Sequence, residues 1–179
     1  MWPASSRRMR PKMEPLVETV IEDGRWEELD LPALATRAAE ATLAALDMPA
    51  EGFTLVVMGC DDARIAELNG AFRQKGKPTN VLSWPSEERA SEEPGMAPEP
   101  PEPGDPEDPE PLGDVAIAFE TCQREAAEQG KPVTDHVTHL LVHGVLHLLG
   151  YDHVEEADGD LMEATETRIL AGLGVPDPY

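Results

Sequence analysis

The sequence predicts a single α/β domain in which a mixed sheet of about four strands packs with helices. Short apolar runs of strand length alternate along the chain with longer segments of helical periodicity. The length of 179 residues is sufficient for one domain with a sizeable core, whereas two full domains would need a longer chain.

Four apolar runs have the length and pattern of strands. They cover residues 15–21, 53–58, 80–84 and 112–119. Gly52 and Gly59 bound the second run, which is typical of a buried strand. In the fourth run Val115, Ile117 and Phe119 alternate with other residues, as they do in a strand with one buried face.

Five segments are predicted to be helices. They cover residues 33–46, a stretch that begins after residue 61 or 62, and residues 121–129, 134–149 and 155–170. Asp30 is the expected N-cap of the first helix, and Asp61 or Asp62 that of the second. Gly130 and Gly150 are expected to end the third and fourth, because glycine readily adopts the left-handed conformation that follows a helix.

A proline-rich acidic segment carries much of the negative charge. Residues 86–111 contain ten acidic residues, one arginine and eight prolines. We expect this segment to be a disordered insertion in a domain of residues 13–175, which follows a disordered N-terminal extension over residues 1–12. The net charge of -22 would by itself disfavour nucleic-acid binding. Because so much of it is local, the average is a poor guide to the folded surface.

The expected location of the protein is cytoplasmic. No apolar run approaches the roughly 20 residues needed to cross a membrane, so no membrane partner is expected. The basic start of the chain is not followed by the apolar stretch of a secretory signal. Cys60 and Cys122 stand apart without metal-ligand spacing, and we interpret them as reduced thiols.

Three histidines have the spacing of metal ligands. His143 and His147 are four residues apart, so they lie on one face of the predicted helix. Gly150 allows the chain to turn back and bring His153 to the same ion. Three protein ligands leave a fourth position for water, which is typical of a catalytic zinc site. Imidazole also suits copper, nickel and iron, so the motif predicts metal binding more specifically than it predicts the metal.

The residue after the first histidine distinguishes this motif from a protease motif. The spacing H-x-x-x-H-x-x-G-x-x-H matches the metzincin signature except at that position. Metzincins have a glutamate there, which acts as general base, and this chain has Gly144. The metal ligands are therefore present without the group that transfers a proton in peptide hydrolysis, which disfavours a zinc peptidase.

Other polar residues near the motif have open assignments. His139 could be a ligand in another register or a partner of a ligand, and His136 is expected to be solvated or to cap a helix. Asp152 is a candidate for orienting a ligand histidine through a hydrogen bond. The general base is left unassigned.

Three motifs together resemble the YbeY family of bacterial metal-dependent endoribonucleases. They are HGVLHLLGYDH at residues 143–153, PTNVLSWP at residues 78–85 and LGDVAIA at residues 112–118. They occur in the order of the family and cover most of residues 53–171. The resemblance implies a zincin-like α/β fold with one zinc ion on His143, His147 and His153. It also places a family arginine on Arg73 and an acidic helix of the family on residues 160–166.

The resemblance further implies an activity and partners. The expected activity is single-strand-specific cleavage of RNA in ribosomal RNA maturation and ribosome quality control. The expected partners are single-stranded RNA and ribosomal RNA, proteins of the small ribosomal subunit, and an Era-type GTPase. His143, His147 and Arg73 would be the catalytic residues. Zinc lowers the pKa of bound water to about 7, and the guanidinium of Arg73 would stabilise charge on the phosphate, beside Lys75 and Lys77.

Two alternatives to the ribonuclease hypothesis are kept. One is a ribosome-assembly factor whose metal is mainly structural, which the small number of acid and base groups near the histidines favours. The other is the zinc peptidase that Gly144 disfavours.

Overall fold

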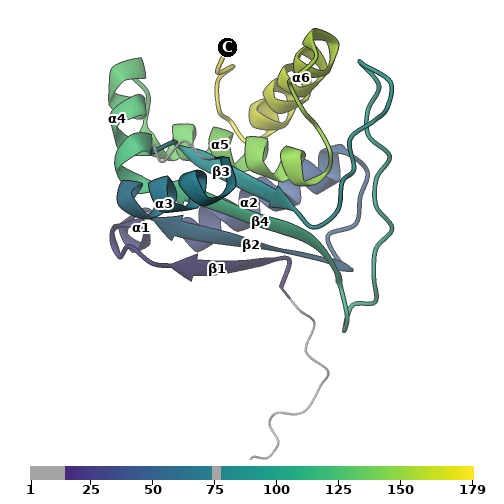
Figure 1. The fold of residues 1–179 in the computed structure, drawn as a ribbon, viewed down its shortest axis with the longest axis horizontal. Coiled ribbons are helices and arrows are strands. Elements are labelled where there is room, and N and C mark those ends of the chain that lie inside the picture. The colour runs from purple at the N-terminus through teal and green to yellow at the C-terminus, as the bar shows by residue number, and fades with distance from the viewer. Residues whose placement is uncertain (1–14, 74–77) are drawn as a thin grey trace, which may run out of the picture.

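The computed structural model describes residues 15–73 and 78–179. Within them, four strands and six helices form an α/β domain (Figure 1). Their bounds are β1 Val17–Ile21, α1 Arg25–Glu28, α2 Leu31–Ala45, β2 Phe53–Cys60, α3 Asp62–Arg73, β3 Val81–Pro85, β4 Glu110–Ala118, α4 Phe119–Gln129, α5 Val133–Leu148 and α6 Glu156–Gly172. The expected N-terminal extension, together with Lys75 and Lys77, lies outside the described residues.

The sheet has the strand order β1-β2-β4-β3. Strands β1, β2 and β4 run parallel to one another, and β3 pairs with β4 in the antiparallel direction. The predicted α/β class with a mixed sheet of about four strands is therefore confirmed. Because β3 is an edge strand, its outer side is left open for the groove described below.

Helices cover the two faces of the sheet unequally. The larger core cluster joins the inward side chains of the strands to α2 and α5, with Leu55, Ile117 and Leu141 among its fully buried members. A smaller cluster lies on the opposite face, where Ile65 of α3 packs with Leu82. Helix α5 also packs against β3 and β4, and α6 packs against α5, so the histidine helix is held on several sides (Figure 1).

Most predicted helix ends agree with the structure. The side chain of Asp61 accepts a hydrogen bond from the backbone amide of Arg64 at 2.8 Å, so Asp61 is the N-cap of α3. Gly130 follows α4 with a φ of 65°. Asp30 precedes α2 as expected, but it has a φ of 54° and makes no capping hydrogen bond through its side chain.

The short helix α1 was not predicted. Its central residue, Trp26, is completely buried and donates a hydrogen bond from Nε1 to the backbone oxygen of Cys60 at 2.9 Å. The ring also meets Phe119 edge-on, with 5.2 Å between the ring centroids. A helix of four residues is too short to show a helical pattern of apolar residues in the sequence. Its position depends instead on contacts with distant parts of the chain.

The acidic insertion follows an extended path along one side of the domain (Figure 1). Strand β4 begins at Glu110, so the last two residues of the predicted insertion belong to a strand. The backbone amide of Gly95 donates to Asp158 at 2.8 Å, and that of Gly104 donates to the oxygen of Gly52 at 2.9 Å. The composition predicts disorder over residues 86–111, whereas the structure shows these contacts with the domain.

Arg89 makes the most extensive contact of the insertion. Its side chain is 7% exposed. Nη1 donates to the backbone oxygens of Leu112 and Leu148 at 3.1 and 2.9 Å, and Nη2 donates to Oγ of Ser86 at 2.9 Å. Leu148 is the last residue of α5, so one guanidinium connects the end of the histidine helix to the early part of β4.

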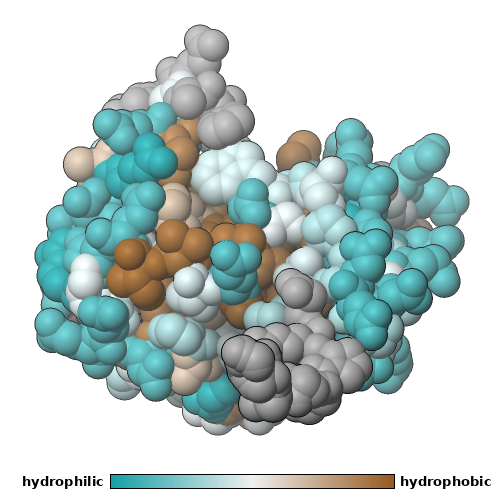
Figure 2. All heavy atoms as spheres, turned by 90° about the horizontal axis from the view of Figure 1, so that it is seen from below, coloured by the Kyte–Doolittle hydropathy of each residue, from teal (hydrophilic) through white to brown (hydrophobic). Residues whose placement is uncertain are grey.

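The surface combines hydrophilic and hydrophobic areas. Figure 2 shows hydrophobic residues gathered on the face seen from below, bordered by hydrophilic ones. Val20 of β1, 38% exposed, and Val154, 82% exposed, are among the large apolar residues that reach solvent. No helix in the described part of the chain is long and apolar enough to span a bilayer.

Candidate metal centre

Helix α5 places His143 and His147 on the side that faces the edge of the sheet. Between them, Gly144 packs directly on the strands. A Cβ atom at this position would lie 3.0 Å from Cγ1 of Val115 and 3.4 Å from Oγ of Ser83. Glycine therefore allows α5 to approach β4 and β3 closely, and any larger residue at this position would require Val115 to shift.

The chain reverses after α5 through a glycine turn. Gly150 has a φ of 102°, its backbone amide donates to the oxygen of His147 at 3.0 Å, and that of Tyr151 donates to Leu146 at 3.0 Å. This pair of hydrogen bonds defines a Schellman motif, as the sequence predicts for a helix followed by glycine. A Cβ on Gly150 would lie 2.4 Å from the backbone oxygen of Arg89, so the turn also needs glycine for space.

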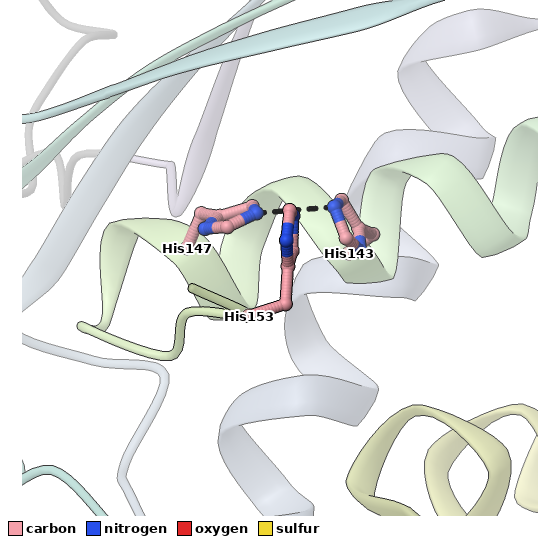
Figure 3. A group of neighbouring side chains, drawn as sticks. All are labelled: His143, His147 and His153. Carbon is pink, nitrogen blue, oxygen red and sulfur yellow. Dashed lines mark hydrogen bonds between the residues drawn. The ribbon is translucent and has the colours of Figure 1, made fainter. Parts of the chain in front are cut away.

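The turn brings the third histidine to the other two. One ring nitrogen from each of His143, His147 and His153 lies within 4.8 Å of the others (Figure 3). The Nε2 atoms of His143 and His147 are 3.1 Å apart. Two nitrogens bound to one tetrahedral zinc at about 2.0–2.1 Å would be about 3.3 Å apart. The rings thus stand close to the spacing that a shared ion requires.

The three histidines differ in exposure. His143 and His147 are partly buried and His153 is exposed. Burial and the neighbouring His143 and His153 lower the pKa of His147 to about 4, so its ring is neutral at pH 7, the form that binds a metal. Within residues 15–73 and 78–179, no fourth histidine, cysteine or carboxylate joins this group.

A buried carboxylate from α6 orients His143. Oε2 of Glu166 lies 2.5 Å from Nδ1 of His143, and Oε1 lies 2.9 Å from Nε2 of His139. Glu166 has no exposed surface. Burial alone would raise the pKa of its carboxyl, but hydrogen bonds from His139 and His143 lower it to about 2. An ionised Glu166 accepts the Nδ1 proton of a neutral His143, which leaves Nε2 free to bind a metal.

The remaining polar residues have the following places. His139 is not in the three-histidine group and instead contacts Glu166, the carboxylate that also contacts His143. His136 is 4% exposed and contacts Glu125 at 2.8 Å, so the expectation of a solvated or capping residue is wrong. Asp152 accepts a hydrogen bond from the backbone amide of Val154 at 2.9 Å. Its expected role of orienting a ligand histidine stays a prediction, and at His143 the carboxylate contact is made by Glu166.

An open groove of about 790 Å³ lies beside the histidines. Its lining includes residues 78–83, Arg89 and the residues of the Gly150 turn. The groove also receives the side chains of two carboxylate residues, Glu88 and Asp152. It is large enough for a nucleotide-sized group to reach the three rings.

Arg73 is the last residue of α3. Its side chain lies outside the part of the chain that the structure describes, so the expected contact with phosphate stays a prediction.

Comparison with known proteins identifies the family. The family model described as endoribonuclease YbeY matches residues 18–174. The endoribonuclease YbeY of Paracoccus denitrificans is 58% identical over 163 residues, which cover 91% of this chain and 89% of that protein. The chain belongs to the endoribonuclease YbeY family. The resemblance predicted from the three motifs is thereby confirmed.

Further members of the endoribonuclease YbeY family match over most of their length. The Ruegeria pomeroyi member is 57% identical and covers 91% of this chain and 97% of that protein. A Rhodopseudomonas palustris member is 44% identical and covers 96% of this chain and 84% of that protein. A solution structure from Thermotoga maritima superposes with a TM-score of 0.52 at 18% identity, over 88% of this chain and 91% of that one, which supports the fold alone.

Proposed function

We propose that this chain is a zinc-dependent endoribonuclease that cleaves single-stranded RNA during ribosomal RNA maturation. Its relatives carry the name of an endoribonuclease, an enzyme that hydrolyses RNA phosphodiester bonds. The observation that carries the proposal is the convergence of three imidazole nitrogens within 4.8 Å at the side of an open groove.

The residues that would act in the reaction have distinct tasks. His143, His147 and His153 would hold the ion, and Glu166 would keep His143 turned toward it. A bound zinc ion supplies Lewis-acid chemistry, which acidifies water and polarises a phosphoryl oxygen. Arg73 would bind the phosphate and offset charge that develops on its oxygens. The groove would receive the nucleotide next to the scissile bond.

The packing of Gly144 opposes the peptidase alternative. Metzincins have their general base at this position, whereas this chain has a glycine that packs against Val115. A casein digestion assay on the purified, metal-loaded protein is therefore expected to be negative.

The decisive experiment measures cleavage of single-stranded RNA by the zinc-loaded protein. We expect cleavage that is lost with EDTA and with His147→Ala, and that returns when zinc is added back to the wild type. His136→Gln, on the same helix but facing Glu125, serves as the matched control and should retain activity. Cleavage that survives both EDTA and His147→Ala would refute the metal mechanism. Metal analysis of the same samples identifies the ion.

A cellular assay separates the enzyme from the assembly factor. In cells that lack their own member of the family, the wild type should restore ribosomal RNA maturation and a folded His143→Ala variant should not. Restoration by His143→Ala would favour an assembly factor with a structural metal. The proposed partners in the small ribosomal subunit and the Era-type GTPase rest on the family resemblance, and pull-down from such cells tests them. The proposed cytoplasmic location rests on the sequence features given above.

A further inference from the structure

Tyr179 reaches the carboxylate that orients His143. Its hydroxyl makes a short hydrogen bond to Oε1 of Glu166 and lies 3.3 Å from Nε2 of His139. The Tyr179 ring also meets the His139 ring edge-on, with 5.5 Å between centroids. Although the residue as a whole is 58% exposed, its polar end therefore lies against the fully buried Glu166.

The last residues are fixed to α6 near the same carboxylate. Oδ1 of Asp177 accepts a hydrogen bond from the backbone amide of Tyr179 at 2.9 Å, and one from Oγ1 of Thr167 at 3.4 Å. Thr167 follows Glu166 directly on the helix. The tail is thus held by the same turn of α6 that carries Glu166, which limits the positions open to the tyrosine hydroxyl.

The two oxygens of Glu166 have different partners. Oε1 accepts from His139 and Tyr179, and Oε2 accepts from His143. A carboxylate held through one oxygen alone can rotate about its terminal torsion, which has broad and shallow minima. His139 and His143 each hold one oxygen of the carboxylate, and the Tyr179 hydroxyl adds a second donor on Oε1, which limits that rotation further and keeps Oε2 directed at Nδ1 of His143. A tyrosine hydroxyl is protonated at neutral pH, so it supplies this donor throughout the physiological range.

We propose that Tyr179 is a positioning residue for the metal centre, which acts through Glu166. By fixing the rotation of the Glu166 carboxylate, it holds the His143 ring with its proton on Nδ1 and its Nε2 toward His147 and His153. The inference rests on the proposed metal site and adds to it a residue that lies 26 positions beyond His153 in the sequence.

The experiment compares zinc affinity and histidine spectra of the full chain with those of Tyr179→Phe. Outer partners of metal ligands typically contribute about 10–100-fold to affinity. Tyr179 acts one step further out, so we expect Tyr179→Phe to weaken zinc binding about 5- to 10-fold in a chelator competition assay. The ¹⁵N resonances of His143, which makes no hydrogen bond to Tyr179 itself, should also move in the metal-free protein, because a purely structural role of the ring, which phenylalanine retains, would leave them in place.

A matched control removes a hydroxyl that does not contact the carboxylate. Thr165 precedes Glu166 on α6, is 6% exposed, and donates its hydroxyl to the oxygen of Leu161 at 2.7 Å. Thr165→Val should bind zinc within about two-fold of the wild type, while its circular dichroism and that of Tyr179→Phe show that both variants are folded.

The outcomes separate the two proposals. If the wild type binds zinc through its three histidines and Tyr179→Phe binds it equally well with unchanged ¹⁵N resonances, the role of Tyr179 is refuted and the metal site stands. If the wild type itself binds no zinc, the proposed zinc-dependent function is refuted, independently of Tyr179.

Discussion

Nδ1 of His143 lies 2.5 Å from Oε2 of Glu166, although the two residues belong to different helices, α5 and α6. The carboxylate has no exposed surface, so water cannot substitute for it at the histidine. A ligand held in this way keeps both its tautomer and its ring orientation before a metal arrives.

Glu166→Gln should weaken zinc binding by about 10- to 100-fold, because the amide replaces an ionised acceptor that fixes the His143 ring. Chelator competition with the purified protein measures the dissociation constant. Glu163→Gln, an exposed position on the same helix, is the matched control and should bind zinc as the wild type does. Equal affinities for the two variants would show that Glu166 has no part in orienting the ligand.

Arg89→Ala should lower the free energy of unfolding by about 2–4 kcal/mol, because it removes charge-assisted hydrogen bonds to the backbone oxygens of Leu112 and Leu148. Urea denaturation measures this value. Limited proteolysis of the variant should also cut within residues 90–109 sooner.

The matched control is Arg64→Ala, which removes only exposed ion pairs with Glu22 and Glu67. It should lower the free energy of unfolding by less than about 1 kcal/mol. Similar losses for the two arginines would contradict the anchoring role of Arg89.

Gly144→Glu should lower the free energy of unfolding by about 1–3 kcal/mol. The new side chain would have to displace Val115 and would carry a charge into the contact between α5 and the sheet. Thermal denaturation followed by circular dichroism measures the loss. Gly172→Glu introduces the same side chain where no atom lies within 4 Å of the new Cβ, and its melting temperature should stay within a few degrees of the wild type. A folded Gly144→Glu protein that digests casein would revive the peptidase hypothesis.

The two cysteines should resist alkylation in the folded protein. Burial, with further contributions from Glu22 and Asp61, raises the pKa of Cys60 to about 12, and burial also raises the pKa of Cys122. Both residues are fully buried. At pH 8.5, where an ordinary thiol is about half ionised, iodoacetamide should modify neither within an hour and both in 8 M urea. Mass spectrometry counts the labels, and rapid labelling of the native protein would contradict the closed packing of β2 and α4.

The grouping of the three histidines could be predicted from the sequence because it depends on local geometry. Four residues along a helix place His143 and His147 on one face, and Gly150 determines the turn that returns His153. Glu166 could not be found in this way, since its contact with His143 depends on how α6 crosses α5. The only signal for it was the acidic helix of the resembling family, which did not indicate which carboxylate is buried.

The insertion shows where composition alone is insufficient. Its prolines and acidic residues predict little burial, and most of its side chains are exposed. The single arginine of the segment is nevertheless nearly buried, because the free carbonyl groups at the end of α5 and near the start of β4 need a donor. The presence of a single arginine among ten acidic residues was the signal in the sequence that could have pointed to this anchoring contact.

Contacts at Gly95 and Gly104 tie the span of the insertion between them to the domain at both ends, and apart from Pro98 its residues are exposed or partly exposed. Lengthening a surface loop costs little free energy, about 0.6 kcal/mol for each doubling. This span is therefore a natural place for a purification tag or a fluorescent label. Met96 and Pro98 line a hollow together with Tyr151 and Asp152. A reporter introduced after Pro98, at residues 99–102, would therefore avoid the residues that border the histidine turn, whereas one placed before Arg89 would pull on it.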